Sequence, residues 1–193
     1  MNSRTSEVLG PSDLNEPVLK RLFEYWLSKH VGDQPPSRDD IDPLELPDIL
    51  PHVGLIDVDW SGDEVAFRYR LIGTAMSEMF GEDFTGTYLY EQKSGYYADF
   101  LHDLYLDVAS SKRPILSESQ FGYRGRQGVL DRSHLWIRRL MLPLVEHGVV
   151  TMMLFTNHFQ PANDEQMRAP YLQRDIVDVS ETLRAYVESG PSA

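Results

Sequence analysis

Three prolines spaced four residues apart, Pro43, Pro47 and Pro51, restrict the folding of this chain more than any other sequence feature. Each proline fixes its own φ angle, and its ring disfavours helix at the residue before it. We therefore expect residues 35–52 to form short, stiff turns and no long helix. A strand-like run begins directly after them, at Val53.

Alternating apolar residues predict five strands, of which the first two form a hairpin around a Ser61-Gly62-Asp63 turn. His147-Gly148 predicts a second tight turn, between the last two strands. Short helices are expected near 74–80 and 88–92, and a longer helix over 95–110. The expected strands are Val53–Asp59, Glu64–Ile72, Ile115–Tyr123, Ser133–Val145 and Val149–Phe159.

An amphipathic helix is predicted over about residues 16–31, because large apolar residues recur there at helical spacing. Strand 133–145 is apolar on both faces, so each of its faces needs a cover. We expect this N-terminal helix to cover one face of the sheet or to pair with its copy in a homodimer. Its apolar stripe consists of Leu19, Leu22, Phe23, Trp26 and Leu27.

The chain divides into three predicted parts. Residues 1–14 are polar and are expected to be disordered. Residues 15–160 hold one domain that includes the N-terminal helix. Residues 161–193 are predicted to be a linker followed by a C-terminal helix at about 175–188, with apolar residues at helical spacing.

Composition argues against several classes of function. With 18 basic and 30 acidic residues, the net charge of −12 disfavours binding to nucleic acid or to anionic membranes. No apolar run is long enough to span a membrane and no leader is evident, so we expect a cytoplasmic protein. Cysteine is absent, and neither a metal-binding histidine motif nor a nucleophile motif occurs. We expect no metal, no cofactor and no catalysis.

Two blocks of residues form a spaced pattern. The first block is Arg38, Asp42, Pro43, Leu46, Pro47, Leu50 and Pro51, and the second is Arg70, Gly73, Gly81 and Gly86. These blocks resemble the PAS domains of bacterial signalling proteins, in particular the fifth PAS subfamily. That resemblance covers roughly residues 16–160 and implies an α+β fold, a five-stranded antiparallel sheet with a helical layer on one face.

The resemblance also implies where a small ligand would bind, between the helix over 95–110 and the sheet. An arginine that faces this interior would favour an anionic group on the ligand, but the sequence leaves open whether Arg70, Arg138 or Arg139 does so. The competing interpretation is that the same side chains fill the core. The predicted ligand-binding residues are Arg70, Met76, Met79, Phe80, Tyr88, Phe100, Leu104, Trp136 and Arg138.

The favoured function is a non-catalytic signalling module that acts through contacts with a partner signalling protein. A small-molecule sensor with an occupied pocket is one alternative. A small enzyme with a cone-shaped α+β cavity is the other.

Overall fold

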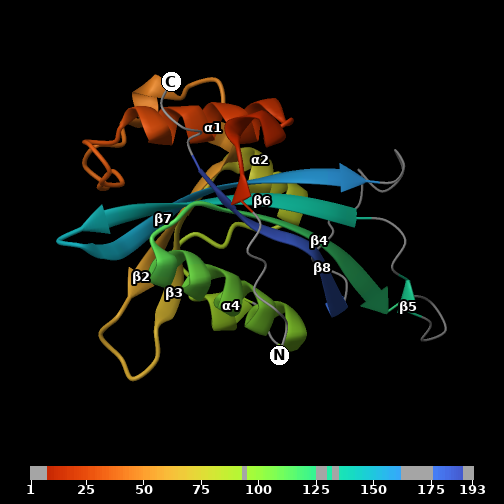
Figure 1. The fold of residues 1–193 in the computed structure, drawn as a ribbon. Coiled ribbons are helices and arrows are strands. Elements are labelled where there is room, and N and C mark those ends of the chain that lie inside the picture. The colour runs from red at the N-terminus through yellow and green to blue at the C-terminus, as the bar shows by residue number, and fades with distance from the viewer. Residues whose placement is uncertain (1–7, 93–94, 125–129, 132–134, 162–175, 189–193) are drawn as a thin grey trace.

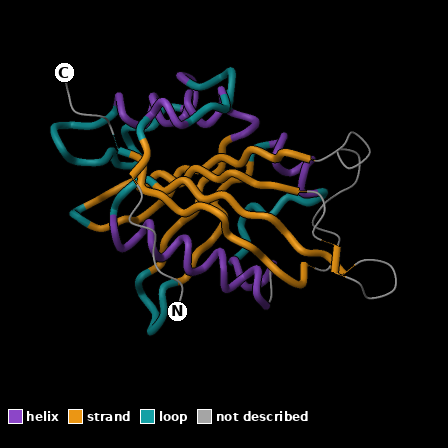
Figure 2. The backbone as a smooth tube through the Cα atoms, turned by 45° about the vertical axis from the view of Figure 1, so that its right-hand side comes forward, coloured by secondary structure: helices purple, strands orange, loops and turns teal. Residues whose placement is uncertain are grey.

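A computed structural model describes residues 8–92, 95–124, 130–131, 135–161 and 176–188. Its centre is one large β-sheet that has helix α1 on one face and helix α4 on the other (Figure 1; Figure 2). The helices are α1 (Pro17–Ser28), α2 (Thr74–Phe80), α3 (Leu89–Gln92) and α4 (Gly95–Ser111), with 3-10 turns at Pro11–Asp13, Pro43–Glu45 and Leu50–His52.

The sheet has eight strands, in the order β1-β8-β4-β6-β7-β2-β3, and β5 pairs with β4 beside this path. All pairs are antiparallel except β1 with β8, which is parallel. The strands are β1 (Val8–Leu9), β2 (Val53–Asp59), β3 (Ala66–Ile72), β4 (Ile115–Arg124), β5 (Leu130–Asp131), β6 (Leu135–Glu146), β7 (Val149–Pro161) and β8 (Ile176–Val187).

The five predicted strands are present and adjacent, as β4-β6-β7-β2-β3, and all their pairs are antiparallel. The prediction of a sheet with five strands in total was wrong, because β8, β1 and β5 extend it beyond β4. The predicted turn at His147-Gly148 joins β6 to β7, and both residues have positive φ, 51° and 77°.

The predicted C-terminal helix was also wrong, since residues 176–187 form strand β8. Their apolar residues fit a helical spacing, but they fit a bulged strand equally well. A register shift opposite Glu118 and Ser119 changes the alternation of β8 partway along its length. As a result Val179 packs on one face of the sheet, and Leu183 and Val187 pack on the other.

The expected disorder of residues 1–14 does not hold for residues 8–14. Val8 and Leu9 pair with Tyr186 and Val187 at the edge that β8 provides. Leu14 is buried with α1, which anchors this segment to the core. Residues 1–7 lie outside the described part of the chain. So do residues 162–175, which include the predicted linker beyond β7.

The predicted N-terminal helix is confirmed as α1, and it covers one face of the protein's own sheet. Pro17 occupies the first turn, where its missing N–H costs no hydrogen bond. The indole N–H of Trp26 donates to the Pro143 carbonyl of β6 at 2.9 Å. Four of the five predicted stripe residues, Leu19, Leu22, Phe23 and Trp26, are buried, and Leu27 is partly buried. The stripe therefore packs within the chain, against its own sheet.

The proline-rich segment packs against the glycine that follows β3. A Cβ atom at Gly73 would lie 2.3 Å from the Pro51 carbonyl oxygen and 2.8 Å from that of Val53. Only a residue without a side chain fits this approach. The contact joins the two blocks of the sequence motif, which are separated along the chain. It sets the position of α2, which begins at Thr74.

Replacement of Gly73 by alanine should destabilise the domain by about 1–3 kcal/mol, because the new methyl group meets backbone atoms that cannot rotate away. Urea unfolding followed by circular dichroism measures the loss. Gly62→Ala is the matched control, since its nearest neighbour, the Glu64 carbonyl oxygen, is 3.4 Å away. Equal stability of the two variants would contradict the packing argument.

Replacement of Trp26 by alanine should cost on the order of 3–5 kcal/mol of unfolding free energy, because the side chain is 3 % exposed. Trp26→Phe should cost less, since it keeps most of the ring and loses the hydrogen bond to Pro143. Lys20→Ala, on the exposed side of α1, serves as the control. A Trp26→Ala variant as stable as this control would show that α1 does not support the sheet.

Candidate functional site

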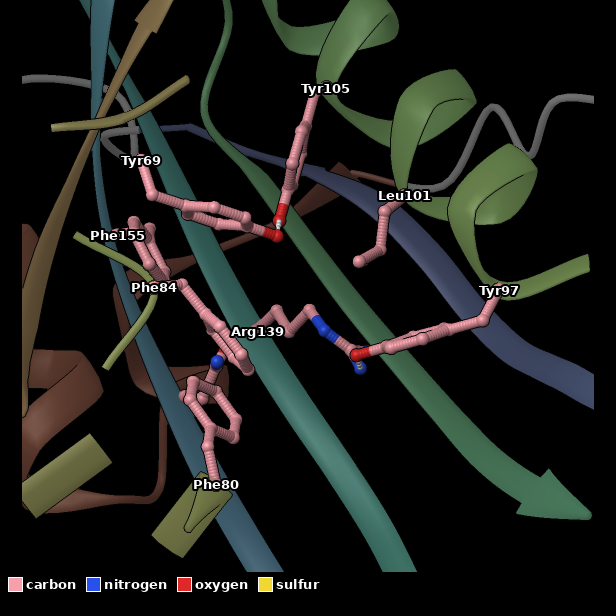
Figure 3. A pocket seen from close by; sticks show the side chains of 9 residues that line it. Tyr69, Phe80, Phe84, Tyr97, Leu101, Tyr105, Arg139 and Phe155 are labelled. Carbon is pink, nitrogen blue, oxygen red and sulfur yellow. Dashed lines mark hydrogen bonds between the residues drawn. The ribbon is translucent and has the colours of Figure 1, made fainter. Parts of the chain in front are cut away.

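A small cavity lies between α4 and the sheet, where the sequence predicts a ligand pocket (Figure 3). Its volume is about 20 Å³, which is room for about one water molecule. Aromatic side chains from both layers form most of its wall. The lining residues are Tyr69, Phe80, Phe84, Tyr97, Leu101, Tyr105, Arg139, Phe155 and Asn157.

Arg139 of β6 is the arginine that faces this interior, and it is only 2 % exposed. Its Nη1 donates to Ser119 Oγ on β4 at 2.7 Å, and its Nη2 donates to the Tyr97 hydroxyl at 3.4 Å. The guanidinium carbon lies 5.6 Å from the ring centroid of Phe100. Arg139 therefore ties the sheet to the start of α4 through hydroxyl groups and an aromatic ring.

Two tyrosine hydroxyls meet on the other side of the cavity. Tyr69 of β3 and Tyr105 of α4 lie 3.4 Å apart, oxygen to oxygen, as Figure 3 shows. Burial raises the pKa of both phenols, well above the ordinary value of 10.0. Both phenols are therefore neutral near pH 7 and act there as hydrogen-bonding groups.

Asn157 of β7 brings an amide group to the cavity wall, opposite Arg139 in the β6–β7 register. Its Oδ1 atom is buried, and no group in the described residues donates a hydrogen bond to it. A buried acceptor of this kind is ordinarily satisfied by an ordered water or by a ligand. The cavity has space for a water at this place.

Five of the predicted pocket residues belong to the helical-layer core. Phe80 lines the cavity itself. Met76 and Leu104 are fully buried in the surrounding core and do not line the cavity. Met79 and Phe100 are partly buried and pack against the edge of that core.

The other four predicted pocket residues lie elsewhere. Arg70, on edge strand β3, and Tyr88 are exposed. Arg138 points to the opposite face of the sheet, where its guanidinium binds Glu16 at 2.6 Å and Glu118 at 3.3 Å. Trp136 shares the face of Arg138, because side chains alternate along β6.

Strand alternation was the signal that could have identified Arg139. Ile137 and Met141 lie two residues before and after Arg139, so they share its side of the strand, and both pack in the helical-layer core. Leu140 and Leu142 lie on the opposite side of the strand and pack beneath α1. The sequence contains this pattern, but it does not reveal which face receives which helix. The same signal applies to Asn157, because Phe155 and Phe159, two residues away on either side, pack in the helical-layer core.

Two further features bear on the chemistry of the described residues. They contain no group of three or more His, Asp or Glu side chains placed to hold a metal ion. No helix among them combines the length and apolarity that crossing a membrane requires.

The buried tyrosines predict a loss of stability in alkali. Because the folded state keeps Tyr69 and Tyr105 protonated above pH 10 while the unfolded state ionises, the unfolding free energy should fall as pH rises above 10. Urea unfolding at a series of pH values measures this slope. Tyr105→Phe should make it shallower, whereas Tyr96→Phe, at an exposed position, should leave it unchanged. An equal slope in all three proteins would contradict the prediction.

Comparison with known proteins agrees with the arrangement of strands and helices. No curated protein matches the chain significantly. The family model described as PAS domain matches residues 14–155, well over half of the 193 residues. The match begins just before α1 and ends within β7, so it includes both helical covers, four of the five central antiparallel strands and the first part of β7. The chain belongs to the PAS domain family.

Proposed function

We propose that this PAS domain is a non-catalytic signalling module that acts through contacts with a partner protein. The observation that carries the proposal is the filled interior. Ligand sites usually measure about 300–1,000 Å³, whereas the cavity beneath α4 measures about 20 Å³. A module with this interior transmits a signal through its surface.

The groups around the cavity support a non-catalytic role. The titratable residues that line it are three tyrosines and Arg139. A general base for chemistry near pH 7 needs a pKa near that value, and burial moves Tyr69 and Tyr105 away from it. None of the cavity-lining residues carries a carboxylate or an imidazole.

Two polar groups favour a small-molecule sensor as the second candidate. The Arg139 guanidinium is buried, and Asn157 Oδ1 lacks a donor among the described residues. Together they offer a donor and an acceptor to a polar ligand. Such a ligand requires the aromatic wall around Phe80 and Phe84 to move, because the present cavity holds about one water.

Native mass spectrometry of the purified protein separates these two functions. The contact-based function predicts the mass of the bare chain, or a multiple of it. Additional mass of a few hundred daltons, present in the original protein and in Arg70→Met but absent in Arg139→Met, would support the sensor instead. Arg70 is the control because its side chain is exposed.

A further inference from the structure

A second, larger cleft lies outside the helical layer and measures about 510 Å³. This volume is within the usual range for small-molecule sites. One wall consists of the end of α1 and the following turn, up to Pro35. The other wall consists of the turn between α4 and β4 together with the end of β8. The cleft thus lies where the N-terminal helix and the last strand meet.

The apolar side of the cleft is formed by partly exposed side chains that lie over the Trp26 ring, which is 3 % exposed. Its indole N–H donates to Pro143, and the Trp26 ring forms the floor of this corner. The His30 ring stands edge-on to it, with 4.2 Å between ring centroids. The remaining apolar lining residues are Leu27, Pro35, Pro114 and Val187.

Four charged residues line the cleft, and two of them neutralise each other. Arg113 pairs with Glu188, and its guanidinium lies 3.7 Å from the Tyr186 ring centroid. Lys112 and Asp33 remain, one on each wall. Within the described residues neither has an ion pair or a side-chain hydrogen bond, so they do not pair with one another. The cleft therefore presents one unpaired cation across from one unpaired anion.

Lys112 also has an unusual backbone conformation. Its φ of 59° lies in the left-handed region, which glycine adopts without strain and other residues rarely adopt. The chain keeps a lysine at a position where glycine would fold more easily. This choice is consistent with a role for the ammonium group.

We propose that the cleft binds an α-amino acid with a large apolar side chain. Its carboxylate pairs with Lys112, and its ammonium group pairs with Asp33. Its side chain packs on the partly exposed Leu27, His30 and Pro35, above the buried Trp26 ring. This ligand satisfies both unpaired charges, which a simple anion or a simple cation does not. The site is separate from the cavity at Arg139 and goes beyond the signalling function proposed above.

Isothermal titration calorimetry with L-phenylalanine tests the proposal. We expect saturable binding of one molecule per chain. Phenylacetate lacks the ammonium group and phenethylamine lacks the carboxylate, so each should bind about tenfold more weakly or worse. Lys112→Met should weaken L-phenylalanine by a similar factor while leaving phenethylamine unchanged. Lys20→Met, on the exposed side of α1, should bind like the original protein.

Lys112→Gly separates binding from folding. Glycine removes the backbone strain, so this variant should melt at the same temperature as the original protein or higher, yet lose binding as Lys112→Met does. Two results would overturn the proposal. One is the absence of saturable binding of L-phenylalanine to the original protein. The other is binding that survives Lys112→Met but is lost in Arg139→Met, which would place the ligand in the inner cavity.

Discussion

The structure depends on the burial of β6 on both of its faces. Alternate residues of this strand enter two separate cores, Ile137 and Met141 beneath α4 and Leu140 and Leu142 beneath α1. A strand that is apolar on both faces requires a cover on each side, and the chain supplies both covers itself. The apolar stripe of α1 is therefore used within the chain.

The same alternation places two neighbouring arginines in opposite environments. Arg138 lies on the α1 side and pairs with the carboxylates of Glu16 and Glu118. Arg139 lies inside the helical layer and is held by Ser119 and Tyr97. Its aliphatic stem and guanidinium occupy space that a ligand would need, which leaves about 20 Å³. The arginine is therefore part of the packing that connects sheet to helix, which supports the proposal that signals are transmitted through the surface.

Local patterns predicted the elements whose residues carry their own signal. The apolar stripe predicted α1, the prolines predicted the turns before β2, and alternation predicted the five central strands. Strand β8 was missed because a bulge opposite Glu118 and Ser119 gives its apolar residues a helix-like spacing. Half of the predicted pocket lies in the right core, but Arg70, Tyr88, Trp136 and Arg138 do not face it. Their orientation depends on which face of the sheet each helix covers, and that is a long-range property.

The central claim is that side chains fill the space beneath α4. A high-resolution crystal structure of the purified protein tests it most directly, through the electron density between Arg139 and Asn157. We expect density for no more than a single water, hydrogen-bonded to Asn157 Oδ1. Continuous density for a larger molecule, with Phe80 or Phe84 displaced, would contradict it and identify the domain as a ligand sensor.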